Sequence, residues 1–100
     1  MQKPEKGFYY HYRHDPKGLI NNYAYEVLGT SLGTEDAQES VVYRPLYQND
    51  FLGRHDFFTR PLAMFIEDIE KDDVAMKRFT KITDETIIRT LERIRDAIDN

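Results

Sequence analysis

The chain has 100 residues, of which 40% are hydrophobic and 13 are Phe or Tyr, enough to form one domain with a modest core. It has no cysteine, which excludes disulfides and thiolate sites and makes a cytoplasmic location the expectation. The net charge is −4 with no basic stripe, and no apolar run is long enough to cross a bilayer, so neither nucleic acid nor a membrane is an expected partner.

The first predicted element is a β-strand over residues 8–14. Residues 1–6 before it are polar and are predicted to be a flexible N-terminus. The aromatic run that follows favours a strand, because aromatic side chains suit a pleated, half-buried surface. Alternation assigns one face to the core and leaves the other towards solvent or a groove. The core face is expected to hold Phe8, Tyr10 and Tyr12, and the other face Tyr9, His11 and Arg13.

Three further strands are predicted between residues 21 and 59. The second covers residues 21–32, and the third, over residues 41–47, is predicted to be the central strand because it is the densest β-branched and aromatic run. Pro45 has no amide N–H, so this strand must end, bulge or lie at an edge near it. A fourth strand is predicted over residues 55–59, followed by a single 3₁₀ turn at residues 61–65.

The C-terminal part is predicted to hold a hairpin and then a helix. Residues 66–70 and 74–82 flank a polar turn and indicate a hairpin, with a helix over residues 65–69 as the alternative. Residues 83–100 form an amphipathic helix capped by Thr83 or Asp84. Such a helix is marginal alone, so it must pack on its own barrel or on a second copy, as a homodimer. Its apolar face consists of Ile87, Ile88, Leu91, Ile94, Ala97 and Ile98.

Several short stretches together resemble one family. They are Gly7–Tyr12 (GFYYHY), Tyr25–Gly29 (YEVLG), Val42-Tyr43 with Leu46-Tyr47, and Arg60-Pro61-Leu62 with Met64-Phe65. Over residues 7–82 the chain is similar to the bacterial domain of unknown function 1653 family. The resemblance implies a mainly β fold, a small SH3-like barrel or roll, and it brings no established activity. Two positions depart from the family pattern: Phe58 stands where Trp is frequent, and Thr30–Gly33 lack a frequent His.

The sequence predicts neither a metal site nor catalytic residues. His11, His14 and His55 with Asp15 or Asp56 are the available metal ligands, but a strand places the first two rings on opposite faces. There is no Gly-x-Ser-x-Gly, no phosphate loop and no His-Glu-x-x-His. No cofactor is expected.

The residues predicted to bind a ligand combine aromatic, titratable and cationic groups. Arg44 and Arg60 both precede proline, which favours extended backbone and fixes where their guanidinium groups point. They could clamp an anion, or brace the fold by pairing with Glu26 or Asp56, and bracing is the favoured interpretation. The predicted ligand-binding residues are Tyr9, His11, Arg13, Arg44 and Arg60.

The function predicted from this surface is a non-enzymatic binding or protein-interaction module. Its partner would be a small anionic or planar ligand, or another protein, because rings stack on planar groups and guanidinium binds anions. The alternative is a small enzyme or nucleotide-handling domain that uses the His11 region.

Overall fold

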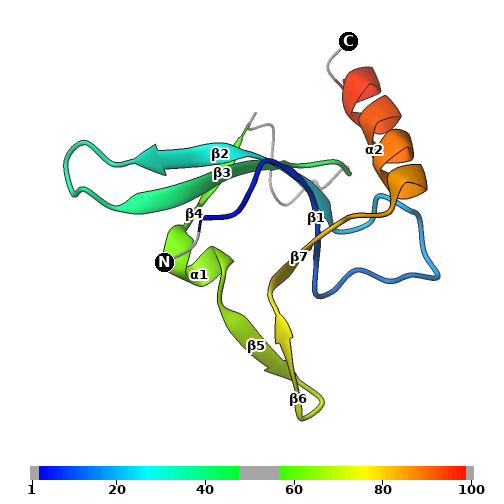
Figure 1. The fold of residues 1–100 in the computed structure, drawn as a ribbon, viewed down its shortest axis with the longest axis horizontal. Helices are drawn as coiled ribbons and strands as arrows, with labels where there is room; N and C mark the ends of the chain where they lie inside the picture. Colours follow the sequence, from blue (N-terminus) through cyan, green and yellow to red (C-terminus); the bar gives the residue numbers. More distant parts are fainter. Residues whose placement is uncertain (1–2, 48–56, 99–100) are drawn as a thin grey trace.

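The computed structural model describes residues 3–47 and 57–98, and this part of the chain forms seven strands and two helices (Figure 1). Every strand pairing is antiparallel, in a five-stranded sheet of order β4-β3-β2-β1-β7 and a separate β5–β6 hairpin. The mainly β class with a C-terminal helix is therefore confirmed. The described strands close no barrel, because β4 and β7 remain edges. The elements are β1 (Gly7–His11), β2 (Ala24–Leu32), β3 (Glu39–Pro45), β4 (Phe58–Pro61), α1 (Leu62–Phe65), β5 (Asp68–Lys71), β6 (Val74–Lys77), β7 (Phe79–Lys81) and α2 (Glu85–Ile98).

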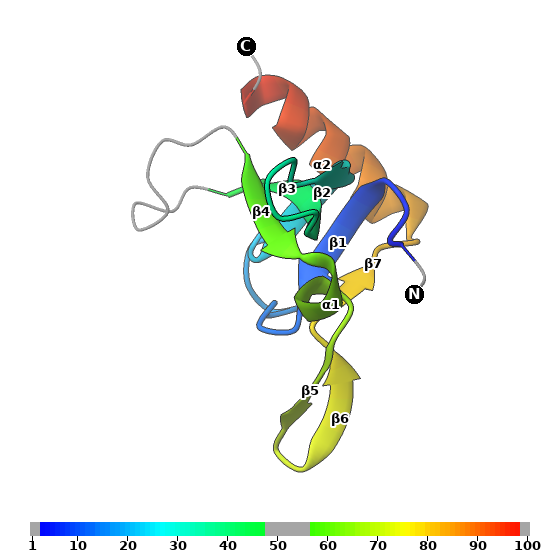
Figure 2. The same ribbon diagram turned by 90° about the vertical axis from the view of Figure 1, so that its left-hand side faces the viewer.

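The large sheet is covered on both faces, by α1 on one and by α2 on the other (Figure 2). The core on the α1 side is mainly aromatic and consists of Tyr9, Tyr25, Val27, Val41, Tyr43, Leu62, Phe65 and Phe79. The core on the α2 side is smaller and consists of Phe8, Ala24, Leu46, Ile82 and Leu91. Successive residues of β1 and β2 therefore enter different cores, since side chains alternate across a strand.

The prediction for β1 was wrong about its end and about its faces. The strand ends at His11 because the chain turns there, and the His14 amide donates a hydrogen bond to the His11 carbonyl at 2.9 Å. Arg13 consequently lies in the turn and not on a strand face. Tyr9, expected to face solvent or a groove, is only 6% exposed and belongs to a core, because Phe8 faces α2 while Tyr9 faces α1. Alternation cannot select the core face of a strand that is buried on both sides.

The predicted second and third strands are present with adjusted limits. The strand predicted over residues 21–32 starts later, because the positive φ of 51° at Tyr23 interrupts the extended backbone. The strand predicted over residues 41–47 ends at Pro45, as expected for a residue without an amide donor. It is an interior strand, but β2 and not β3 holds the middle position. In the fourth predicted strand, residues 55–56 lie outside the described residues.

The predicted hairpin is present over Asp68–Lys71 and Val74–Lys77, but the strand predicted over residues 74–82 is divided, and its second part, β7, pairs with β1 in the large sheet. The 3₁₀ prediction is corrected. The segment at residues 61–65 makes one α-helical turn, because the Ile66 amide donates to the Leu62 carbonyl four positions back, at 3.2 Å. The β5–β6 turn contains Asp72 and Asp73, whose φ angles of 53° and 62° are those of a tight two-residue hairpin turn.

The helix α2 starts where its cap was expected and packs on its own sheet. The Asp84 carboxylate accepts hydrogen bonds from the amides of Thr86 at 2.9 Å and Ile87 at 3.2 Å. Leu91 is fully buried against the sheet, whereas Ile98, at the end of the same face, is 53% exposed. Neither described helix is long and apolar enough to cross a membrane.

Candidate ligand-binding site

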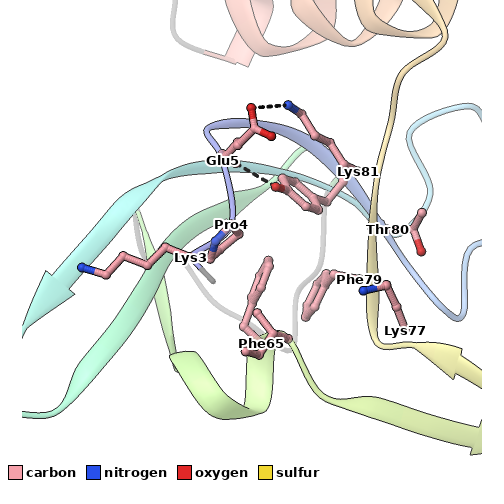
Figure 3. Close-up of a pocket in the computed structure, with 10 residues that line it drawn as sticks. Lys3, Pro4, Glu5, Phe65, Lys77, Phe79, Thr80 and Lys81 are labelled. Carbon is pink, nitrogen blue, oxygen red and sulfur yellow. Dashed lines mark hydrogen bonds and ion pairs between the residues drawn. The ribbon is translucent and has the colours of Figure 1, made fainter. Parts of the chain in front are cut away.

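A pocket of about 480 Å³ lies beside β7, between that strand, α1 and the N-terminal segment (Figure 3). This volume is typical of pockets that hold small ligands. Because β7 is an edge of the large sheet, the pocket runs along a sheet edge. The lining residues are Lys3, Pro4, Glu5, Tyr9, Phe65, Ile66, Lys77, Phe79, Thr80 and Lys81.

The floor of the pocket is a group of fixed aromatic rings. Phe65 and Phe79 stack with ring centroids 4.1 Å apart and planes 4° apart, and Tyr9 meets Phe65 edge to face at 5.8 Å. The Tyr9 hydroxyl donates to the Glu5 carbonyl at 2.8 Å, which ties the N-terminal segment to β1. Burial, and secondarily the Glu5 charge, raises the pKa of Tyr9. The Tyr9 hydroxyl therefore stays neutral at pH 7, and the floor is apolar and preformed.

The rim of the pocket is cationic. Among the described residues, three lysines and one carboxylate line it, and that carboxylate, on Glu5, lies 3.3 Å from the Lys81 ammonium (Figure 3). Lys3 lies 3.7 Å from a carboxylate oxygen of Glu39. The side chains of Glu5 and Lys81 are 78% and 38% exposed, so their ion pair contributes little and can exchange partners.

His11, one of the predicted site residues, lies in the aromatic core and not in this pocket. Its ring meets the Phe79 ring edge to face at 5.1 Å and stacks on Tyr23 at 5.7 Å. Burial lowers the pKa of His11 to about 4, helped by the positive charges of Arg60, Arg78 and Arg13. His11 is therefore neutral at pH 7 and acts there as a packed aromatic ring.

Arg13 and Arg60 lie on the same side of the sheet as His11. The Arg60 guanidinium lies 5.6 Å from the centre of the Phe79 ring, and its Nε donates to the Tyr43 hydroxyl at 3.4 Å. Arg13 Nε donates to the neighbouring Tyr12 hydroxyl at 3.2 Å. Arg60 thus contacts Phe79, a lining residue of the pocket, but does not line the pocket itself.

Arg44 lies on the opposite side of the sheet, facing α2. Its guanidinium contacts Glu26 at 2.9 Å, and the same carboxylate accepts a hydrogen bond from Arg95 of α2 at 3.0 Å. The bracing role favoured for Arg44 is therefore present in the structure. The partner suggested for Arg60, Asp56, lies outside the described residues.

The structure consequently does not gather the five predicted residues into one surface. Tyr9 alone among them lines the pocket. Sequence reasoning missed Phe65, Phe79 and the rim lysines, although Lys77 and Lys81 flank Phe79 at alternating positions. That alternation was a usable signal.

The described residues contain no group of three side chains able to hold a metal ion. His14 stacks on Tyr10 at 3.5 Å and lies within 2.6 Å of the Asn22 carbonyl oxygen through Nδ1, on the other side of the sheet from His11. The remaining predicted ligands, at residues 55–56, are outside the described residues.

Fold and pocket together define a small antiparallel β domain with a C-terminal helix and a cationic, aromatic pocket at one sheet edge. The chain belongs to the family described as protein of unknown function (DUF1653), whose model matches residues 7–81, and the predicted family is thus confirmed. It is similar to the crystal structure of a DUF1653 protein from Bordetella bronchiseptica, with 26% sequence identity and a TM-score of 0.62. The similarity covers 81% of this chain and 94% of that one. Among curated proteins there is no match.

Proposed function

We propose that the chain is a binding module whose pocket beside β7 takes an anionic ligand with a flat apolar part. The observation that carries this proposal is the combination of an aromatic floor with a rim to which residues 3–47 and 57–98 contribute three lysines and one carboxylate. The floor offers apolar contact to a ring or a flat chain, and the lysines attract the anionic group. A binding module with an aromatic and cationic surface was also predicted from the sequence, at a set of residues that shares only Tyr9 with this pocket.

The rim lysines are suited to exchange partners. Lys77 makes no ion pair with any described residue, and the Lys81 ion pair with Glu5 is solvent-exposed. An incoming carboxylate therefore has to displace only Glu5 from Lys81, at a cost of about 0–1 kcal/mol. Binding should weaken as salt is added, because the contacts lie at the surface.

The proposal is tested with 2-naphthoate and its uncharged analogue 2-naphthamide as probes, followed by amide chemical-shift perturbation. We expect 2-naphthoate to shift the amides of Lys77, Thr80 and Lys81, and 2-naphthamide to bind at least threefold more weakly. Lys77→Gln and Lys81→Gln should each weaken 2-naphthoate about threefold, which corresponds to about 0.7 kcal/mol. Lys71→Gln, on β5 and away from the pocket, is the matched control and should have no effect. Shifts that avoid β7, or equal losses in all three variants, would contradict the proposal.

The alternative of an enzyme that uses His11 lacks the grouping it requires among the described residues. No carboxylate contacts the His11 ring there, and His14 lies across the sheet. The buried part of the apolar face of α2 packs on its own sheet. A homodimer through α2 stays a prediction.

A further inference from the structure

We propose that the ligand of the β7 pocket is an extended acidic peptide segment that adds to β7 as a further strand. This inference rests on the proposed function, because it assigns a ligand class to the same pocket. It depends on three features: the unpaired edge of β7, the order of the side chains along it, and the charge of the rim.

The outer edge of β7 offers main-chain groups to a partner strand. On its inner side, the Tyr12 amide donates to the Arg78 carbonyl at 2.9 Å and the Ile82 amide donates to the Phe8 carbonyl at 2.8 Å. Hydrogen-bonded pairs alternate along an antiparallel ladder, so the amides and carbonyls of Phe79 and Lys81 point away from β1. In the part of the chain that the structure describes, these groups have no hydrogen-bond partner.

The side chains beside this edge specify what a partner strand should carry. Phe79 and Lys81 are two residues apart, so they share one face of β7, and both line the pocket with Lys77 (Figure 3). Directly opposite residues on paired strands contact each other. A partner with an apolar ring opposite Phe79 and a carboxylate opposite Lys81 would match this order, and a second carboxylate would reach Lys77.

A peptide fits this edge better than the other anionic polymers do. Single-stranded nucleic acid also combines rings with negative charge, but it cannot form a ladder with alternating amides and carbonyls. Glu5 already shows how a carboxylate reaches Lys81, since it pairs with that ammonium at 3.3 Å from the N-terminal segment. The alternative is that β7 is short and flanked by lysines only to prevent aggregation through its exposed edge. That purely protective role predicts that no peptide binds.

The test uses the acetylated and amidated peptide Thr-Glu-Thr-Phe-Thr-Glu-Thr with the full chain, measured by calorimetry and amide chemical shifts. We expect saturable binding, with loss of solvent exchange at the amides of Phe79 and Lys81. Replacing both glutamates by glutamine should weaken binding at least tenfold. In an antiparallel addition, the amides of the phenylalanine and of the glutamate before it face the carbonyls of Phe79 and Lys81. N-methylation of these two residues should therefore also weaken binding at least tenfold. The same peptide N-methylated at two threonines, whose amides point away, should bind within about threefold of the parent.

The outcomes separate this inference from the proposed function. If 2-naphthoate binds in the pocket but the peptide does not, or if both N-methylated peptides bind as well as the parent, the strand-addition inference fails and the proposed function stands. If neither 2-naphthoate nor the peptide shifts β7, both fail. If oligothymidylate binds the pocket more tightly than the peptide, nucleic acid is the ligand class and the peptide inference is overturned.

A gain-of-binding variant tests the same geometry without risk to the fold. Glu5→Gln removes the carboxylate that pairs with Lys81, and its side chain is 78% exposed. We expect peptide affinity to rise about threefold, because Lys81 no longer has to leave an internal partner. Glu70→Gln, on the exposed β5 strand, is the matched control and should leave affinity unchanged. A lower or unchanged affinity in Glu5→Gln would show that Lys81 does not contact the peptide.

Discussion

Replacing Leu91 tests whether α2 is an integral part of the fold. This side chain is fully buried and packs in the core that Phe8, Ala24, Leu46 and Ile82 form on the α2 side of the sheet. Leu91→Ala removes buried methyl groups and leaves a cavity, which costs about 2–5 kcal/mol. For a domain of this size, a loss of about 3 kcal/mol lowers the melting temperature by roughly 12–24 °C. Leu91→Asp should cost more, because it buries an unpaired charge.

The assay is urea denaturation followed by circular dichroism, with Arg89→Ala as the control on the exposed side of the same helix. We expect a lower midpoint with an unchanged slope for Leu91→Ala, and a change within about 0.5 kcal/mol for the control. Equal midpoints for Leu91→Ala and the wild type would refute the packing argument. Sedimentation of the wild type and Leu91→Asp adds a second criterion, since a lower molecular mass of Leu91→Asp would place the contact between two copies.

Two further perturbations concern charges on the two faces of the sheet. Glu26→Gln removes the carboxylate that Arg44 and Arg95 share, and we expect the free energy of unfolding, measured by urea denaturation, to fall by about 1–3 kcal/mol. The control Asp96→Asn should leave it unchanged. Equal midpoints for Glu26→Gln and the wild type would show that this ion-pair network does not stabilise the fold. Burial and nearby arginines lower the pKa of His11 to about 4, so below about pH 6.5 the unfolded chain binds this proton before the folded one does. Stability from neutral His11 is complete above about pH 6.5 and is lost towards pH 4, by about 1–2 kcal/mol after allowance for solvent screening. His11→Gln should flatten that part of the pH profile, and parallel profiles would rule the effect out.

The elements with one polar side could be predicted from the sequence. The helix α2 has a single apolar face at helical spacing and a cap residue, and both features are local. The β5–β6 hairpin has two aspartates at its turn, where the backbone adopts left-handed angles. In each case local residues identify the element and its ends, although α2 depends on its packing against the sheet for stability.

The candidate site could not be predicted because its parts meet only through tertiary contacts. Lys3 and Lys81 line the same pocket because β7 pairs with β1 and Glu5 ties the N-terminal residues to both strands. Phe65 and Phe79 stack only once α1 covers the sheet. Tyr9 was assigned to the outer face because it alternates with His11 and Arg13 in the sequence, whereas β1 ends at His11 and is buried on both faces.

The position of β1 explains how a pocket can form at an edge of so small a sheet. Its residue Phe8 packs in the core beneath α2, and the next residue, Tyr9, forms part of the pocket floor. The backbone of β1 is thus fixed by packing on the α2 side of the sheet. The end of β7 is fixed in the same way, because Ile82, the residue after it, packs in that core and donates its amide to the Phe8 carbonyl. Because α2 contributes no residue to the pocket, it can stabilise the site without restricting what binds there. We therefore expect variants in the α2 core to lower stability while leaving ligand affinity unchanged under conditions where the chain is folded.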